Sequence, residues 1–150
     1  MTEYCAVSKW LAKHAEWAPV FLRLGVGIVF LVHGLGKLLA IGPAPLGLAG
    51  TAGFLASIGV PAAGFFAWVV ALVETLGGLA LILGLFVRYA ALLLAVVMLV
   101  AIVTVHWKNG FILPAGYEYA LTLLAGSLTL MFSGAGSKWN LEHKFCKKEC

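Results

Sequence analysis

Long apolar stretches, separated by short polar or Gly/Pro-rich breaks, dominate this chain. A helix needs about 20 mainly apolar residues to cross about 30 Å of hydrocarbon. The pattern predicts four such helices, at residues 19–41, 62–86, 89–106 and 117–132. The shortest connection, between the second and third helices, favours antiparallel neighbours. The expected fold is therefore all-α, an antiparallel bundle of four transmembrane helices in a single domain over residues 1–150.

Two shorter segments flank the first predicted helix. Residues 5–17 precede it and place apolar side chains at helical spacing among charged ones, as an amphipathic segment at the membrane interface does. The sequence GPAPLG at residues 42–47 then breaks the helix. Residues 52–58 have room for one or two helical turns before Pro61. A short re-entrant or interfacial helix is therefore expected between helices one and two.

Composition narrows the class of protein. Hydrophobic residues make up 63% of the 150 residues, and charged residues make up only 11%, against about 25% in ordinary soluble domains. A soluble domain of this size leaves too much surface in water to hide so many apolar side chains. The composition excludes a soluble globular protein, a disordered chain and a disulfide-rich secreted domain. It indicates an integral membrane protein in contact with the lipid bilayer.

Charge sets the expected orientation. The formal net charge is +4, and a polar tail at residues 134–150 holds four of the ten Lys and Arg residues. Basic residues form no stripe with interleaved aromatics, so no nucleic-acid partner is expected. With both termini inside, only Lys37 and Lys108 of the ten basic residues lie outside. We expect a multi-pass protein of the bacterial plasma (inner) membrane, and for such a protein the positive-inside rule predicts that both termini are cytoplasmic.

The three cysteines, Cys5, Cys146 and Cys150, all lie in the polar ends of the chain. No CxxC pair is present, so the chain lacks what a quinone-linked thiol–disulfide enzyme requires. Cysteines facing the reducing cytoplasm are expected to be free thiols. The spacing of Cys146 and Cys150 has no second ligand pair beside it, so we expect a basic tail that favours anionic lipid rather than a metal site.

Ionisable residues inside the predicted helices are the informative positions, because charge in hydrocarbon is costly and usually faces the bundle interior. His33 and Lys37 lie one turn apart near the outer end of the first helix, and Glu74 lies near the middle of the second. His106 ends the third helix, and Glu118 opens the fourth. We expect these residues to converge on one ligand-binding site in the outer half of the bundle. Glu74 and His33 are its catalytic candidates.

Structural roles are open for most of these residues. Lys37 and Glu118 can extend to the membrane interface, and the two histidines can serve as carbonyl-bonded or interfacial residues. Glu74 differs, because a side chain in the middle of a spanning helix does not reach water, so it needs a polar partner, a ligand or a bound proton. Histidines and a glutamate are metal-ligand types. However, the spacing of His33 and His106 makes no metal motif, and no flavin or haem motif is evident.

Stretches in the first, second and last parts of the chain resemble the DoxX family of small membrane proteins. They read LRLGVGIVFLVHGLGKL at residues 22–38, FLASIGVP at 54–61, VETLGGLALILGLFVR at 73–88 and GYEYALTLLAGSLTLMFSGAGSKWNLE at 116–142. His106 matches the family's histidine at the end of helix three. Each piece is weak alone, but their order over most of the chain is specific. The resemblance implies a four-helix membrane fold.

The resemblance implies function more loosely, and two hypotheses follow. The family includes the membrane subunit of a quinone-reducing thiosulfate dehydrogenase and proteins tied to oxidative-stress defence. The first hypothesis is a quinone-linked redox component, with electrons delivered by a protein partner. In it Lys37 and His33 donate hydrogen bonds to the quinone carbonyls, while Glu74 or Glu118 relays protons. Whether the chain is itself an enzyme, as the membrane subunit of a quinone-dependent oxidoreductase, is left open.

The second hypothesis is a non-enzymatic membrane scaffold or assembly factor for a redox complex. Its buried charges would fix the register of the helices, a role that polar core residues can take. Transport of a small solute through the polar cluster is weaker, because four short helices leave little room for a pathway in a monomer. An oligomer, which the sequence also allows, could supply one.

Overall fold

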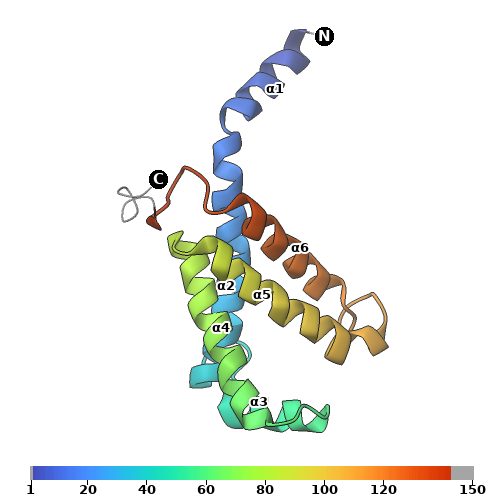
Figure 1. Ribbon diagram of the computed structural model, residues 1–150. Helices are drawn as coiled ribbons and strands as arrows, with labels where there is room; N and C mark the ends of the chain where they lie inside the picture. The colour runs from blue at the N-terminus through green and yellow to red at the C-terminus, as the bar shows by residue number, and fades with distance from the viewer. Residues whose placement is uncertain (1, 143–150) are drawn as a thin grey trace.

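Two long apolar helices pack along each other at the centre of the molecule (Figure 1). They are α2 (Ala18–Leu39) and α4 (Ala63–Leu83). The computed structural model describes residues 2–142, and within them all regular secondary structure is helical. The bounds of α2 and α4 differ by at most three residues from those predicted. The all-α class expected from the apolar pattern is confirmed for the described residues.

Glycines bring α2 and α4 into close contact. A Cβ atom added at Gly34 would lie 2.4 Å from the backbone nitrogen of Thr75, and one added at Gly78 would lie 2.6 Å from that of Leu31. Only glycine tolerates these distances, and small residues allow membrane helices to approach in this way. The close packing fixes the register of α2 against α4, and so it fixes which polar side chains face each other.

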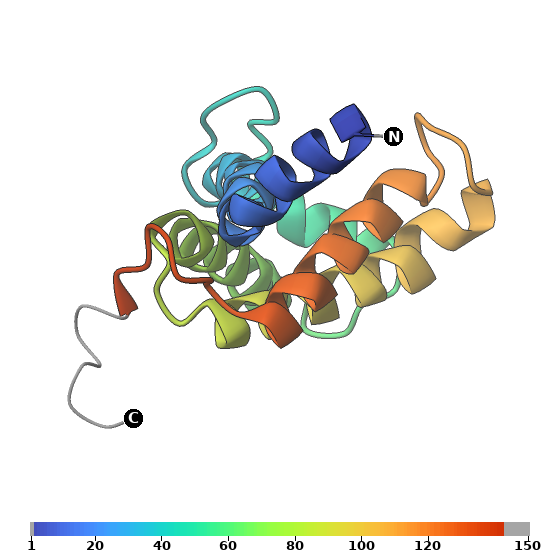
Figure 2. The same ribbon diagram turned by 90° about the horizontal axis from the view of Figure 1, so that it is seen from above.

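A second pair of helices crosses the first pair at an angle (Figures 1 and 2). It consists of α5 (Val87–Ala101) and α6 (Glu118–Ser133), which pack side by side. The expected helix at 89–106 is not α-helical throughout. It continues as a π-helical segment, η2 (Ile102–His106), and a 3-10 turn, η3 (Trp107–Asn109). The π-helical segment begins in a run of β-branched side chains, which are less favourable in an α-helix.

The helix between α2 and α4 is longer than expected. It forms α3 (Gly47–Ser57), about three turns, where one or two turns over 52–58 were predicted. Its start lies within the Gly/Pro-rich stretch because Gly47 adopts a positive φ of 66° and the Thr51 hydroxyl donates to the Gly47 carbonyl. Packing against α4 and α2 then holds α3 across one end of the bundle (Figure 1).

The N-terminal segment is also helical, as α1 (Thr2–Lys13) and the 3-10 turn η1 (Ala15–Trp17). α1 projects beyond the bundle at the end where α2 begins (Figure 1). Its side chains from residue 5 onward are exposed, including Trp10 at 60%. The interfacial position of this exposed helix stays a prediction from the sequence.

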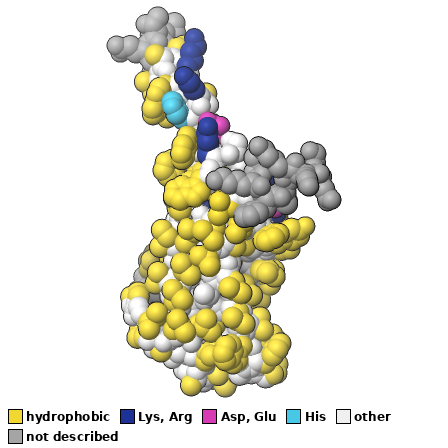
Figure 3. Space-filling model, turned by 90° about the vertical axis from the view of Figure 1, so that its left-hand side faces the viewer, with side chains coloured by type: hydrophobic (Ala, Val, Ile, Leu, Met, Phe, Trp, Pro, Cys, Tyr) yellow, Lys and Arg dark blue, Asp and Glu magenta, His cyan; other side chains and the backbone are white. Residues whose placement is uncertain are grey.

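Apolar side chains cover the outside of the bundle, and Figure 3 shows this for one face. Large side chains such as Phe21, Leu76 and Phe132 are 60–73% exposed on α2, α4 and α6. In water such a surface would be unfavourable, whereas lipid accommodates it. Within the described residues 2–142, three helical stretches are long and apolar enough to cross a membrane, namely Ala15–Leu39, Ala63–Leu83 and Val87–Asn109. The predicted fourth crossing falls on α6, which has only 16 residues.

The chain returns after α6 to the end of the bundle where α2 begins. The guanidinium of Arg23, which is only 1% exposed, donates to the carbonyls of Lys138 and Trp139 at 3.3 and 2.8 Å. Arg88 donates to the last carbonyls of α6, those of Met131 and Phe132. Arg23 therefore binds the exit segment, residues 134–142, and Arg88 binds the end of α6 that precedes it. The rest of the predicted tail, with Cys146 and Cys150, lies outside the described residues.

Candidate functional site

An ion pair joins the two central helices. The Lys37 ammonium on α2 donates to the Glu74 carboxylate on α4, with 2.5 Å between Nζ and Oε2. The Glu74 side chain is 5% exposed and the Lys37 side chain is 21% exposed. A buried carboxylate in an apolar bundle needs a partner of opposite charge, and Lys37 is that partner. The polar partner that the sequence requires for Glu74 is thus on the neighbouring helix.

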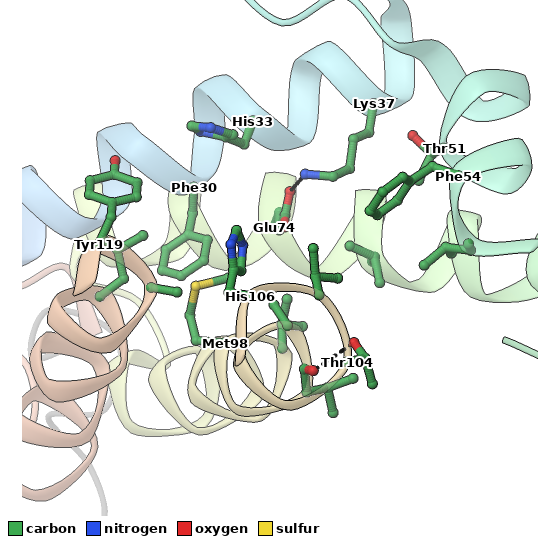
Figure 4. Close-up of a pocket in the computed structure, with 18 of the residues that line it drawn as sticks. Phe30, His33, Lys37, Thr51, Phe54, Glu74, Met98, Thr104, His106 and Tyr119 are labelled. Atoms are coloured by element: carbon green, nitrogen blue, oxygen red, sulfur yellow. Dashed lines mark hydrogen bonds and ion pairs between the residues drawn. The ribbon is translucent and has the colours of Figure 1, made fainter. Parts of the chain in front are cut away.

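The pair lies in the wall of a cavity of about 480 Å³. The cavity is lined by residues of α2, α3, α4, α5 with η2, and α6, in the half of the bundle remote from α1 and the exit segment. Its polar lining consists of His33, Lys37, Thr51, Glu74, Thr104, His106 and Tyr119. Phe30, Phe54 and Met98 are among the apolar side chains between them (Figure 4). A largely apolar cavity with a few polar groups is typical of small-molecule sites.

Both pocket histidines hold one ring nitrogen against a backbone carbonyl. Nδ1 of His33 lies 2.9 Å from the Val29 carbonyl oxygen, and Nδ1 of His106 lies 3.0 Å from that of Ala115. A carbonyl only accepts, so Nδ1 carries the hydrogen in each ring. The sequence hypothesis had His33 donating to a ligand carbonyl. In a neutral ring that donates through Nδ1, Nε2 is an acceptor.

Glu118 does not line this cavity. Its Oε1 accepts a hydrogen bond of 2.7 Å from the backbone N–H of Leu113, in the loop before α6. The side chain turns toward that loop because the loop offers an unpaired N–H beside the first turn of the helix. The structure therefore brings together His33, Lys37, Glu74 and His106 of the five predicted residues, and it leaves Glu118 outside the cavity lining.

Three polar pocket residues were not anticipated from the sequence: Thr51, Thr104 and Tyr119. Hydroxyls are common in membrane helices, since they satisfy themselves on the preceding turn. Thr51 and Thr104 do so, with the carbonyls of Gly47 and Val100. Their positions gave no sequence signal, because Thr51 lies on the unexpectedly long α3 and Thr104 within the π-helical segment.

Within residues 2–142, no group of three or more His, Cys, Asp and Glu side chains is arranged to hold a metal ion. The lining instead offers one cation, one carboxylate, two imidazoles and three hydroxyls to a ligand. These groups can bind a small polar head group, and the apolar walls can bind the rest of a lipophilic molecule.

Comparisons with known proteins show the family to which this chain belongs. A family model described as DoxX matches residues 18–107, which run from the start of α2 to the start of η3 and carry most of the pocket. Among solved structures, none matches this chain. Similar curated proteins include the "Putative oxidoreductase CatD" of Bacillus subtilis, 37% identical over 118 residues that cover 79% of this chain and 81% of the relative.

Two further relatives carry no assigned activity in their names. The "Uncharacterized membrane protein Rv3486" of Mycobacterium tuberculosis is 35% identical over 90% of this chain and 86% of its own length. An "Uncharacterized protein" of Haemophilus influenzae is 35% identical over 92% of this chain and 98% of its own length. With a family match over more than half of the chain and relatives of similar length, this integral membrane protein belongs to the DoxX family.

Proposed function

We propose that this protein is a quinone-linked component of a membrane redox or oxidative-stress system, and that the pocket binds the quinone head group. The observation that carries the proposal is a single buried ion pair, Lys37–Glu74, in the wall of an otherwise largely apolar cavity of about 480 Å³. Such a cavity suits a molecule with a small polar head and a lipophilic tail. The name of the relative CatD as an oxidoreductase supports a redox role.

The pocket residues have chemistry that suits this ligand. A bound quinone supplies the capacity to carry electrons together with protons. Lys37 has hydrogens left to donate after its bond to Glu74. The free Nε2 atoms of His33 and His106 can accept protons, and Glu74 can hold or pass one on. A protein partner in a redox complex is proposed as the electron source.

The location is part of the same proposal. The three relatives named above are bacterial, and for a plasma membrane protein the positive-inside rule favours both termini in the cytoplasm. The pocket would then open in the outer half of the bilayer. Quinones dissolve in the bilayer, so a pocket among the helices would be reached from lipid.

Mass spectrometry on protein gently extracted from its own membrane tests the proposal. We expect quinone to co-purify near stoichiometry, and to be lost in Glu74→Gln and in Met98→Trp, which fills the cavity. The matched control is Glu118→Gln, because that carboxylate is engaged by the loop and does not line the pocket. Thermal melting confirms that each variant is folded. Quinone no more abundant than in bulk lipid, or equally retained by both pocket variants, would overturn the proposal.

The ion pair also favours a second candidate, a non-enzymatic scaffold or assembly factor. Lys37 and Glu74 pair with each other without a ligand and join α2 to α4. Their role can therefore be to fix the register of the two helices and nothing more. A reproducible protein partner, together with an absence of bound quinone in the same extraction, would favour this candidate.

A further inference from the structure

The pocket hydroxyls of two threonines have already used their only hydrogen. Thr51 Oγ1 donates to the Gly47 carbonyl at 2.7 Å, and Thr104 Oγ1 donates to the Val100 carbonyl at 2.8 Å. A hydroxyl has one donor and two lone pairs. Each threonine therefore offers a ligand in the pocket an acceptor and no donor.

The two imidazole rings of the pocket also use an N–H within the protein. His33 and His106 each hold Nδ1 against a carbonyl oxygen, at 2.9 and 3.0 Å. Neutral imidazole carries a single N–H, so Nε2 of each ring is left with a lone pair. Glu74 adds carboxylate oxygens, which accept only. Donors come from the remaining hydrogens of Lys37 and from the Tyr119 hydroxyl, which can rotate to either role.

The lining is therefore rich in acceptors, and a ligand that fits it must bring donors. We infer that the pocket binds a lipid-soluble hydroquinone, the reduced dihydroxy form, in preference to the oxidised quinone. The inference rests on the proposed function and specifies which form of the ligand the site selects. Each hydroquinone hydroxyl can donate to a pocket acceptor, and one of the two can also accept from Lys37. Both carbonyls of a quinone only accept, so they would compete for the same few donors.

The discrimination has a chemical precedent in sites built for hydroxyl ligands. Such a site rejects an analogue without the hydroxyl, because its own buried groups are left unpaired. The apolar side chains Phe30, Phe54 and Met98 contact a ring of similar size and the same tail in both forms. The main difference between the two forms is therefore in the hydrogen bonds of the two ring oxygens.

Saturable binding of decylubiquinol and decylubiquinone to the full chain in nanodiscs tests the inference. Empty nanodiscs correct for partition into lipid, and excess reductant under anaerobic conditions keeps the quinol reduced. One additional hydrogen bond of ordinary strength corresponds to about fivefold in affinity. We expect the quinol to bind at least about fivefold more tightly than the quinone on that basis.

Variants then locate the preference. His106→Phe keeps a ring in the pocket but removes the nitrogen acceptor. Thr104→Val removes the hydroxyl acceptor and keeps a side chain of similar volume. Each is expected to bring the ratio of the two affinities toward one, with thermal melting to verify folding. His14→Phe is the matched control, because His14 makes the same Nδ1 contact to a carbonyl, that of Trp10 at 2.8 Å, outside the pocket. It should leave the ratio unchanged.

The outcomes separate this inference from the proposed function. Saturable binding in which the quinone binds as tightly as the quinol, or more tightly, overturns the inference and leaves the quinone-linked function standing. A ratio that His106→Phe and Thr104→Val both leave unaltered also overturns it. Absence of saturable binding by either form overturns the inference and the proposed function together.

Discussion

Glu74 shows how a single residue connects the fold of this protein to its candidate chemistry. It lies in the middle of α4 with its side chain 5% exposed, and Lys37 of α2 meets it at 2.5 Å. Lys37 is less deeply buried and borders the cavity. The pair therefore joins two helices and also presents charged groups to the pocket.

At this scale we predict a stability cost for breaking the pair and a recovery when both charges are removed. Glu74→Leu leaves the Lys37 ammonium without its carboxylate in an apolar setting. We expect a loss of about 2 kcal/mol in the free energy of unfolding, below the range for fully buried pairs because Lys37 is partly exposed. Reversible unfolding in detergent micelles measures it.

The double variant Lys37→Met with Glu74→Leu provides the control. Replacing both charges with apolar side chains removes the uncompensated ammonium, so most of the lost stability should return. A double variant as unstable as Glu74→Leu would mean that the cost arises from altered packing of α4 and not from the unpaired charge.

At the scale of elements, the contact between α2 and α4 depends on glycine. Gly34→Ala would place a methyl group 2.4 Å from the backbone nitrogen of Thr75, so the helices must separate. We expect a loss of about 1–3 kcal/mol, the range for overpacking, measured as a lower thermal midpoint. Gly25→Ala on the same helix is the matched control, because its Cβ meets nothing within 4 Å. Equal effects of the two substitutions would contradict close packing at Gly34.

The elements also show what the sequence could predict and what it could not. Long apolar runs located α2 and α4 to within three residues, because lipid leaves few alternatives to a helix. The same logic identified Glu74, since its charge is costly inside such a run. The length of α3 depends on packing against α4 and α2, and the π-helical segment on a local change of hydrogen bonding. Neither has a clear periodic signal.

The direction of side chains at helix ends was equally beyond prediction. Glu118 opens α6 as expected, but its carboxylate binds the Leu113 N–H, and Tyr119 beside it lines the pocket. A change of one residue along a helix turns the side chain by about 100°. Which of two neighbours faces the cavity is set by how α6 packs on α5, and that packing is a tertiary property.

At the scale of the whole molecule, contacts hold the segment before α2 and the segment after α6 together at one end of the bundle. Glu16 at the start of the bundle accepts from the Ser137 hydroxyl and pairs with Lys138, both at 3.1 Å. The N–H of Glu142 donates to the Gly84 carbonyl at the turn after α4. The entry to α2, the link between α4 and α5, and the exit after α6 therefore share one end. The pocket lies in the opposite half.

This arrangement requires α6 to carry the chain back across the thickness of the bundle. Its 16 residues span about 24 Å, which is less than the hydrocarbon core of about 30 Å. Local thinning of the bilayer can accommodate a short helix. Flanking loop and exit residues can supply the remaining length. We therefore predict that α6 completes a fourth crossing.

Cysteine labelling tests the crossing in intact cells. Each probe is the sole cysteine of its variant, with the other native cysteines replaced by serine: Cys5 itself, Lys108→Cys in η3, and Ser137→Cys after α6. A membrane-impermeant maleimide is expected to label Lys108→Cys in intact cells, and to label the other two only after the membrane is opened. Cys5 and Ser137→Cys are expected to behave alike, because the ion pair between Glu16 and Lys138, which Ser137→Cys leaves in place, holds the entry and exit on one side. Labelling of Ser137→Cys together with Lys108→Cys, while Cys5 stays protected, would mean three crossings and an α6 that lies along the membrane.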